Sequence, residues 1–323
     1  MLETIALPGS GRRTTRVGFG GSGLMGGLSE RESLRLLETA FDVGIRHYDV
    51  APSYGHGMAE RCLGKFLRGR ADQITVTTKY GILPPAQVSL VALARNAARP
   101  VARRIPSLRK GVAQAAASLK TRARFSAEEA QRSLERSLRE LGLERVDLWL
   151  LHEVTADNLD RSDLLPFMQS AQQQGRIASF GIGGDRSHAD AVWERHREFC
   201  RVLQFESSVP DPPPEFPGAF QIHYRAIYGG QSILNKMFDR DPQLSRRWSV
   251  ELDVNLADPE IRAALLLRAA LLSNRDGMVL FSSRHPEHIL SNVRMAGDLA
   301  WAARARRFLE LLRNRHPQAS AGL

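Results

Sequence analysis

The sequence predicts an α/β fold in which eight parallel strands close into a (β/α)8 TIM barrel, in a single domain over residues 1–323. Short β-type runs recur eight times along the chain, and helical patterns lie between most of them. Alternation of strands and helices predicts a parallel sheet, and eight such units predict its closure. Several of the runs also end in an ionisable residue, where a barrel of this kind carries its chemistry.

The eight predicted strands are short apolar or β-branched runs bounded by turn residues. They are Val17–Gly21, Ile45–Val50, Ile74–Lys79, Val146–His152, Ser179–Gly183, Val202–Ser207, Phe220–Ile227 and Gly277–Ser282. A doubly wound sheet is the competing fold, and it would ordinarily place a glycine-rich phosphate loop and a helix after its first strand. Residues 18–23 are rich in glycine, but no helical pattern follows them directly. The barrel is therefore preferred.

Three of the predicted helices have clear start signals. Helices are predicted over 30–43 and 127–141, each opened by the capping-box pattern S-x-x-E, at Ser29 and Ser126, and each followed by glycine. A third helix begins after Asp258, where proline occupies the first helical position.

The composition indicates a globular protein with a large core. Hydrophobic residues make up 43% of the chain, and no apolar run approaches the ~18–20 residues needed to span a bilayer. Residues 1–21 lack the apolar centre of a signal peptide. Cys62 and Cys200 provide no disulfide framework, and neither has metal-ligand spacing, so no metal site is predicted. We therefore expect a cytoplasmic protein.

The formal net charge of +10 is concentrated in one segment. Between Ile82 and Phe125 there are nine Lys or Arg residues and no Asp or Glu, which leaves 36 basic against 35 acidic residues elsewhere. This basic insertion follows the predicted third strand, and amphipathic helices are predicted within it at 88–98 and 110–121. Such a segment can attract an anionic substrate, a phospholipid surface or nucleic acid, but a solvated arm is the preferred interpretation.

Three other segments are expected to lie outside the strand–helix rhythm. Residues 1–11 are expected to form a hairpin that plugs the end of the barrel opposite the mouth. Residues 228–276 are expected to add a loop at the mouth. Residues 317–323 are expected to form a disordered tail.

The stretch 46–64 contains the strongest functional signal. The predicted second strand ends in Asp49, and a Pro-Ser-Tyr-Gly turn puts Tyr54 five residues further on. The predicted third and fourth strands end in Lys79 and His152. Because the carboxyl ends of barrel strands meet at one rim, these four side chains are expected to converge on one mouth.

These four residue types suit proton transfer to a carbonyl oxygen. A free phenol has a pKa of ~10 and is a poor acid at neutral pH unless a cation stabilises its phenolate. Lys79 can supply that charge, and Asp49 can hold the ammonium by a charge-assisted bond. His152 can hydrogen-bond a substrate carbonyl or relay a proton. Each residue alone has a structural explanation, but their joint occurrence at successive strand ends favours a catalytic role for Tyr54 and its three neighbours.

The same stretch resembles the aldo-keto reductase family, whose pattern here is roughly D-x-A-x-x-Y-G-x-G-x-x-E-x-x-L-G. The matching residues are Asp49, Ala51, Tyr54, Gly55, Gly57, Glu60, Leu63 and Gly64. The resemblance covers residues 16–293 and implies a barrel with an NAD(P) cofactor. It also implies a catalytic tetrad with tyrosine as general acid/base, formed by Asp49, Tyr54, Lys79 and His152.

A second part of the resemblance lies at 279–293, where a strand ends in a small polar loop before a helix. Backbone N–H groups at a helix N-terminus, with Ser and Arg side chains, make an anion site. In the family this segment binds the adenosine phosphate. The residues implied are Ser282, Ser283 and Arg284 at the phosphate or ribose, and His288 and Asn292 at the adenosine end. Many NADPH-specific members carry Arg or Lys where His288 stands, so the preference between NADP and NAD stays open.

The nicotinamide end departs from the family pattern. Members usually carry Ser-Asn after the fifth strand, and this chain has Gly183–Gly184. Gln204 matches the family's carboxamide-contacting glutamine, and Tyr224 falls where an aromatic ring stacks on the nicotinamide. Arg225 stands where a small serine is common and, like Asp49, is assigned to the cofactor site. The glycine pair leaves two interpretations open: room for another cofactor pose or a bulkier substrate, or weakened cofactor binding.

The sequence therefore predicts an NAD(P)-dependent oxidoreductase that interconverts an aldehyde or ketone and an alcohol by direct hydride transfer. Arg225 and the basic insertion favour a polar or anionic small-molecule substrate such as a sugar. The alternative is a cofactor-sensing or regulatory barrel with little turnover, which the missing Ser-Asn pair would suit. A nucleic-acid partner is disfavoured, because only the basic insertion would support it. The physiological substrate and the oligomeric state do not follow from the sequence.

Overall fold

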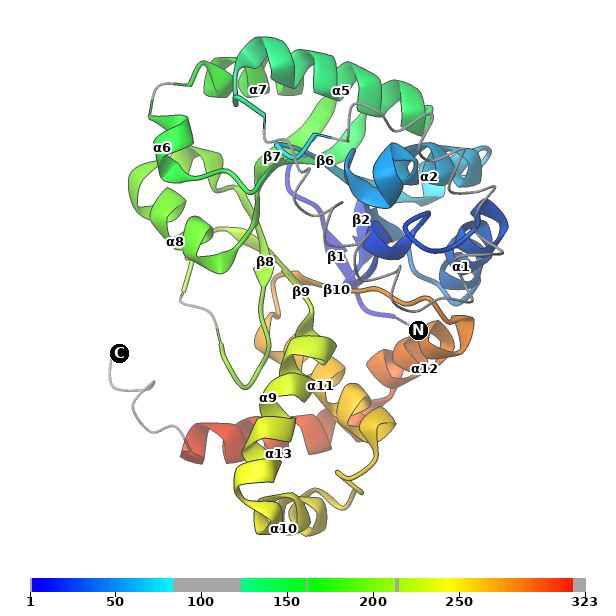
Figure 1. Cartoon of the computed structure of the whole chain (residues 1–323), viewed down its shortest axis with the longest axis vertical. Coiled ribbons are helices and arrows are strands. Elements are labelled where there is room, and N and C mark those ends of the chain that lie inside the picture. The colour runs from blue at the N-terminus through cyan, green and yellow to red at the C-terminus, as the bar shows by residue number, and fades with distance from the viewer. Residues whose placement is uncertain (1, 84–122, 161, 213–214, 316–323) are drawn as a thin grey trace, which may run out of the picture.

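Eight parallel strands close into a barrel in the computed structural model, which describes residues 2–83, 123–160, 162–212 and 215–315 (Figure 1). Around the barrel the strands follow the order β10-β3-β4-β5-β6-β7-β8-β9, and neighbouring strands are parallel. Their bounds are β3 (Val17–Gly20), β4 (His47–Asp49), β5 (Thr75–Tyr80), β6 (Val146–His152), β7 (Ile177–Gly184), β8 (Val202–Glu206), β9 (Phe220–Tyr224) and β10 (Met278–Phe281). The predicted (β/α)8 barrel is confirmed.

Seven of the eight strands lie within one or two residues of their predicted ends. The exception is β9, which ends at Tyr224 although the predicted strand runs to Ile227. Arg225 has a left-handed backbone, with φ of 59°, and stands at the N-cap of the helix that follows. Extended structure cannot continue through a residue in that conformation, so the strand stops there.

The helices of the first two thirds of the chain lie outside the barrel, between successive strands (Figure 1). They are α1 (Glu30–Asp42), α2 (Ala59–Leu67), α5 (Ala127–Leu141), α6 (Ala156–Leu159), α7 (Leu164–Gln173) and α8 (Arg186–Arg195), with the short 3-10 helices η1 (Gly21–Gly23), η2 (Tyr54–Gly57), η3 (Ala71–Gln73) and η4 (Arg197–Phe199). Before α1 the predicted capping box forms in full, because Ser29 and Glu32 each accept the other's backbone N–H. Before α5 only half forms: Ser126 accepts the N–H of Glu129, but the Glu129 carboxylate accepts that of Arg124.

An antiparallel hairpin of β1 (Thr4–Ala6) and β2 (Arg13–Thr15) precedes the barrel. Leu7, next to β1, belongs to the cluster of apolar side chains that fill the barrel interior. Ser10 in the same turn donates to Asp147, the second residue of β6, over 3.1 Å. The hairpin therefore closes the amino-terminal end of the barrel, as predicted, but its second strand lies beyond the predicted range of residues 1–11.

Helices occupy most of the segment 228–276. The helix predicted after Asp258 is confirmed as α11, but the loop that the sequence predicts for the rest of the segment is wrong. The described helices from residue 226 onward are α9 (Ala226–Arg240), α10 (Pro242–Leu252), α11 (Pro259–Ser273), α12 (Pro286–Gly297) and α13 (Leu299–Arg315). Side chains of α9, α10, α11 and α13 form an apolar cluster of their own, which includes Trp248, Leu266 and Phe308. Figure 1 shows them as a helical layer beside β9 and β10. Burial of these faces is what stabilises the extra helices.

The connection from β8 to β9 contains no helix in its described residues, 207–212 and 215–219. Five prolines stand between residues 207 and 219, and a proline in a helix interior both removes a hydrogen bond and clashes with the preceding turn. In place of a helix, Phe216 packs on Phe205 of β8, with ring centroids 5.4 Å apart. The outer face of β9 is consequently covered less completely than that of β8.

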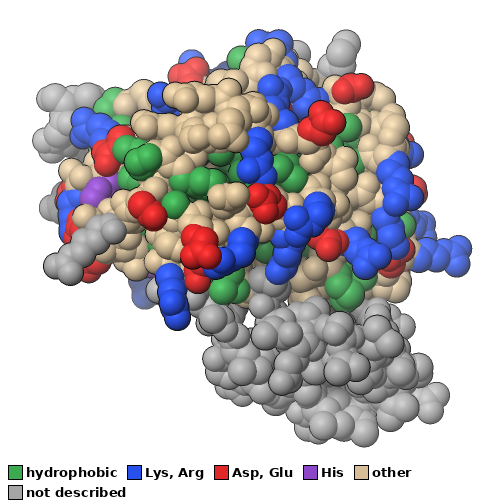
Figure 2. Space-filling view, turned by 90° about the horizontal axis from the view of Figure 1, so that it is seen from above, with side chains coloured by type: hydrophobic (Ala, Val, Ile, Leu, Met, Phe, Trp, Pro, Cys, Tyr) green, Lys and Arg blue, Asp and Glu red, His purple; other side chains and the backbone are tan. Residues whose placement is uncertain are grey.

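Two groups of predictions made from the sequence fall outside the described residues. They are the helices at 88–98 and 110–121, and the tail at 317–323. None of the described helices is both long enough and apolar enough to cross a membrane. Figure 2 shows one face of the molecule, on which Lys and Arg side chains stand among Asp and Glu side chains.

His223 should make the protein sensitive to mild acid. Its ring is buried on the outer side of β9 against Phe205, and burial lowers the pKa of His223 to about 4. In the unfolded chain His223 takes up a proton near pH 6.5, whereas in the folded protein it does so only near pH 4. The contribution of neutral His223 to the free energy of unfolding is therefore complete above pH 6.5 and is lost as the pH falls towards 4. We expect a loss of about 3 kcal/mol from this group. His223→Phe keeps the ring contact, and its free energy of unfolding should depend less on pH between 6.5 and 4; an unchanged slope would exclude His223 as the cause.

Candidate active site

The carboxyl ends of β4, β5 and β6 bring the four predicted tetrad residues to one rim. Asp49 is the last residue of β4, Lys79 the penultimate residue of β5 and His152 the last residue of β6. Tyr54 opens η2, just beyond β4. In parallel strands these ends meet at the same edge, so residues distant in the chain become neighbours.

A tight loop holds Tyr54 in position. Gly55 has a left-handed backbone, with φ of 57°, and a Cβ there would lie 2.5 Å from the carbonyl oxygen of Leu24. No side chain fits that distance, so only glycine allows the Tyr54 loop to pack on the loop that follows β3. His56 also has a left-handed backbone, which is strained for a residue other than glycine. Residues strained in this way cluster at functional sites.

Lys79 and Asp49 form a buried ion pair beneath Tyr54. The Lys79 ammonium donates to Asp49 Oδ1 over 2.5 Å and to the carbonyl oxygen of Val50 over 3.1 Å. Gln204 Nε2 donates to the other carboxylate oxygen, Asp49 Oδ2, over 2.8 Å. Only 2% of Lys79 and 4% of Asp49 is exposed, so this pair is held in a low-dielectric setting by charge-assisted bonds.

The Tyr54 ring stands between a cation and an imidazole. Lys79 Nζ lies 5.2 Å from the ring centroid, and the His152 ring meets it edge-on with centroids 6.0 Å apart. Burial, followed by the charges of Asp49 and Glu153, raises the pKa of Tyr54. The sequence leads one to expect a pKa lowered by Lys79, but burial and the carboxylates of Asp49 and Glu153 outweigh that effect. The phenol is therefore held protonated, the state that a general acid requires.

One cavity of about 920 Å³ contains the tetrad and every residue that the sequence assigns to the cofactor. Its wall includes Asp49, Tyr54, Lys79, His152, Gln204, Tyr224, Arg225, Ser282, Ser283, Arg284, His288 and Asn292. The cavity thus runs from the tetrad across the mouth of the barrel to the start of α12. The chemical roles of these residues stay predictions.

At the far end of the cavity the loop before α12 is arranged around two serines. Ser282 Oγ donates to the carbonyl oxygen of Gly20, and Ser283 Oγ donates to that of His285 and accepts its N–H. Both hydroxyl protons are thereby donated to backbone carbonyl oxygens, one in β3 and one in the loop itself. Arg284 is exposed and forms no ion pair among the described residues, and no side chain caps the N-terminus of α12. An anion here would therefore meet Arg284 and backbone N–H groups.

Arg225 is less available than the sequence suggests. Its guanidinium forms an ion pair of 3.2 Å with Glu206 and lies 4.9 Å from the centroid of the Tyr228 ring. Its charge is therefore balanced at the rim. The neighbouring Tyr224 donates its hydroxyl to the carbonyl oxygen of Gly184 over 2.9 Å, which fixes its ring across the mouth.

Sequence reasoning missed part of the cavity wall. Tyr228 and Gln231 line it from α9, in a segment where a loop is predicted, and Glu260 lines it from the start of α11, a helix that the sequence predicts without a role in the site. It also missed Glu153, which directly follows His152 and has a left-handed backbone with φ of 58°. The one signal in the sequence is an acidic residue next to a strand-end histidine, and that pattern alone is common.

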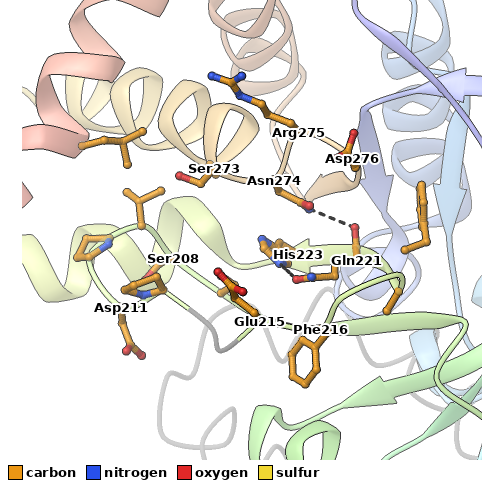
Figure 3. A pocket seen from close by; sticks show the side chains of 18 of the residues that line it. Ser208, Asp211, Glu215, Phe216, Gln221, His223, Ser273, Asn274, Arg275 and Asp276 are labelled. Atoms are coloured by element: carbon orange, nitrogen blue, oxygen red, sulfur yellow. Dashed lines mark hydrogen bonds between the residues drawn. The ribbon is translucent and has the colours of Figure 1, made fainter. Parts of the chain in front are cut away.

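A second cavity, of about 1450 Å³, lies away from the tetrad, among the β8–β9 connection, the end of α11 and α13 (Figure 3). In it His223 is hydrogen-bonded to Gln221, and Asn274 donates to the backbone of Gln221. Its wall includes residues 207–212 and 215–219 of the β8–β9 connection, which form no helix. Acidic and basic side chains line it together, among them Glu215 and Arg275, and no tetrad residue reaches it.

Comparison with known proteins identifies the family. A sequence model of the Aldo/keto reductase family matches residues 16–200. The D-threo-aldose 1-dehydrogenase of Pseudomonas sp is 32% identical over 193 residues, which cover 57% of this chain and 52% of that protein. The L-galactose dehydrogenase of Arabidopsis thaliana is 29% identical over 192 residues, covering 57% and 49%. The chain thus spans about half the length of these curated relatives.

Solved structures agree on the fold. An aldo-keto reductase from Bacillus halodurans in its holo form superposes with a TM-score of 0.69 at 19% identity, covering 97% of this chain and 96% of that one. A glycerol dehydrogenase from Gluconobacter oxydans gives 0.65 at 18%, covering 97% and 95%. Together with the match of the family over more than half of the residues, this means that the chain belongs to the aldo/keto reductase family of oxidoreductases.

Proposed function

We propose that this protein is an NAD(P)-dependent oxidoreductase that interconverts a carbonyl compound and an alcohol, with Tyr54 as general acid/base. One observation carries the proposal: a buried Lys79–Asp49 pair and an edge-on His152 lie beside the Tyr54 phenol in a cavity of about 920 Å³ that reaches from the tetrad to the start of α12. Family membership supports the same reaction class.

Each tetrad residue has a separate role in the proposed proton transfer. Tyr54, held protonated by burial, gives its proton to a carbonyl oxygen in the direction of reduction and recovers it in the direction of oxidation. Lys79 stabilises the phenolate left behind, and Asp49 keeps the ammonium in place. His152 is proposed to orient the substrate oxygen by a hydrogen bond.

The cavity fits a nicotinamide cofactor. Its volume of about 920 Å³ lies at the upper end of the usual range for cofactor sites, ~300–1,000 Å³. Tyr224 offers a ring and Gln204 an amide at the tetrad end, whereas Arg284 offers a cation at the α12 end. When bound, such a cofactor supplies or accepts the hydride at the carbonyl carbon. Arg284 and the uncapped N-terminus of α12 would hold its phosphate groups.

We propose a hydroxyl-rich, sugar-like substrate. The two relatives with the longest matches reported above are named for aldoses, a D-threo-aldose and L-galactose. In this chain the rim of the cavity is polar, with the Arg225–Glu206 pair, Gln231 and Glu260 beside the opening. Sugar hydroxyls are recognised by such donors and acceptors. We also propose a reducing cytoplasmic setting, because Cys62 and Cys200 are both free thiols.

Titration of the protein with NADH and NADPH, followed by tryptophan fluorescence, tests the cofactor site. We expect saturable binding of at least one of them and, in its presence, turnover of an aldose or the corresponding sugar lactone. A matched run with a simple aldehyde that lacks hydroxyl groups should give a lower kcat/KM. Binding without turnover of any carbonyl or alcohol would favour the regulatory alternative, and absence of binding at high micromolar concentration would refute the proposed function.

A further inference from the structure

Glu153 occupies an unusual position at the barrel mouth. It directly follows His152, and its N–H donates to the carbonyl oxygen of Gly183 over 2.8 Å, which extends the β6–β7 ladder by one bond. Its φ of 58° lies in the left-handed region that glycine adopts without cost. A glutamate in that conformation is strained, and such strain in a folded protein accompanies function more often than chance predicts.

The Glu153 side chain fills the space that Gly184 leaves empty. A Cβ at Gly184 would lie 3.0 Å from Glu153 Oε2. The same oxygen accepts the N–H of Asp185 over 3.2 Å and lies 3.4 Å from His188 Nδ1, and 26% of the side chain is exposed. These contacts hold the carboxylate beside Gly184, which itself lines the cavity of the tetrad.

Two other carboxylates at the barrel mouth are paired with a basic side chain, but Glu153 is not paired with a Lys or Arg side chain of the described residues. Asp49 is paired with Lys79, and Glu206 with Arg225. In the described part of the chain no Lys or Arg nitrogen lies within 4 Å of the Glu153 carboxylate. Its field extends into the cavity, because the negative charge of Glu153 contributes to raising the pKa of both Tyr54 and Tyr224.

We propose that Glu153 supplies a negative charge at the nicotinamide end of the cavity, where Gly183 and Gly184 contribute no side chains. This charge would make the oxidised, cationic cofactor bind more tightly than the reduced one. The inference rests on the proposed function. The oxidised nicotinamide ring carries one positive charge and the reduced ring carries none. Both rings carry the same carboxamide group. A hydrogen bond alone would therefore act equally on both forms, but an unbalanced carboxylate in a partly buried site discriminates between them.

Glu153→Gln tests this inference with little change in shape. The dissociation constants of the oxidised and reduced cofactor are measured by tryptophan fluorescence and calorimetry at fixed ionic strength. We expect the ratio of the two affinities to move by about tenfold against the oxidised form, the effect of one unit charge across a partly solvated cavity. Glu153→Asp keeps the charge and should retain most of the preference. Glu194→Gln removes a carboxylate from the exposed side of α8 and should leave the ratio unchanged.

The outcomes separate the inference from the proposed function. If wild-type protein binds both forms and Glu153→Gln shifts their affinity ratio while Glu153→Asp does not, Glu153 acts through its charge. An equal loss of affinity for both forms would show that Glu153 only supports the loop, and an unchanged ratio would show that its charge is not felt; either result overturns the inference alone. A wild-type protein that binds neither form would overturn the proposed function together with it.

Discussion

Replacing Tyr54 with phenylalanine is expected to lower kcat for carbonyl reduction by about 10²–10⁴-fold, the usual contribution of a positioned general acid. The ring would keep its contacts with His152 and Lys79, because neither contact involves the hydroxyl. Cofactor affinity should therefore remain within about twofold of the wild type. The measurement is a pair of assays on one preparation: turnover with saturating cofactor, and cofactor binding by fluorescence.

Tyr228→Phe is the matched control for that experiment. Tyr228 also lines the cavity, and its replacement by phenylalanine also removes only a hydroxyl. Its side chain is exposed on α9 and lies against Arg225, not against the Lys79–Asp49 pair. We expect its turnover to stay close to the wild type. Full activity of Tyr54→Phe would exclude the phenol as the proton donor, and a large loss in both variants would point to a general sensitivity of the mouth instead.

The second large effect is expected for Lys79→Met, which leaves the buried Asp49 carboxylate without its cation. Breaking a buried ion pair by removing one partner typically costs about 3–5 kcal/mol, because the remaining charge stays desolvated. Gln204 still donates to Asp49 Oδ2 and compensates only part of that cost. The free energy of unfolding, measured by urea titration at pH 7, should fall accordingly, and turnover should be lost with it.

The double variant Lys79→Met with Asp49→Asn separates stability from catalysis. The neutral amide removes the unpaired charge, so most of the lost stability should return, while turnover should stay low because no cation remains beside Tyr54. A single variant that is destabilised by less than about 1 kcal/mol would mean that water reaches Asp49 and that the pair is not desolvated. Restored turnover in the double variant would contradict the role assigned to Lys79.

Local patterns were sufficient for the barrel and for the tetrad. A strand or a capping box is encoded within a few adjacent residues, so β6 at 146–152 and the start of α1 at Ser29 were predicted correctly. The tetrad was predictable because Asp49, Lys79 and His152 stand at or next to the ends of strands and Tyr54 follows one of them by a short turn, and parallel strands bring such ends together in any closed barrel. The sequence alone thus specifies the fold class and which residues meet at the mouth.

Other features depend on contacts between segments far apart in the chain. Glu153 lies against Gly184, 31 positions later, only because β6 and β7 pair in this register. The pKa of Tyr54 is raised by its burial in the barrel mouth and by the charges of Asp49 and Glu153, which come from other segments of the chain. The helices α9 and α10 are stabilised by burial against α11 and α13. The charge balance and the burial of a residue depend on which other residues lie near it in space. Those residues come together only when the barrel closes, so a local sequence pattern does not reveal them.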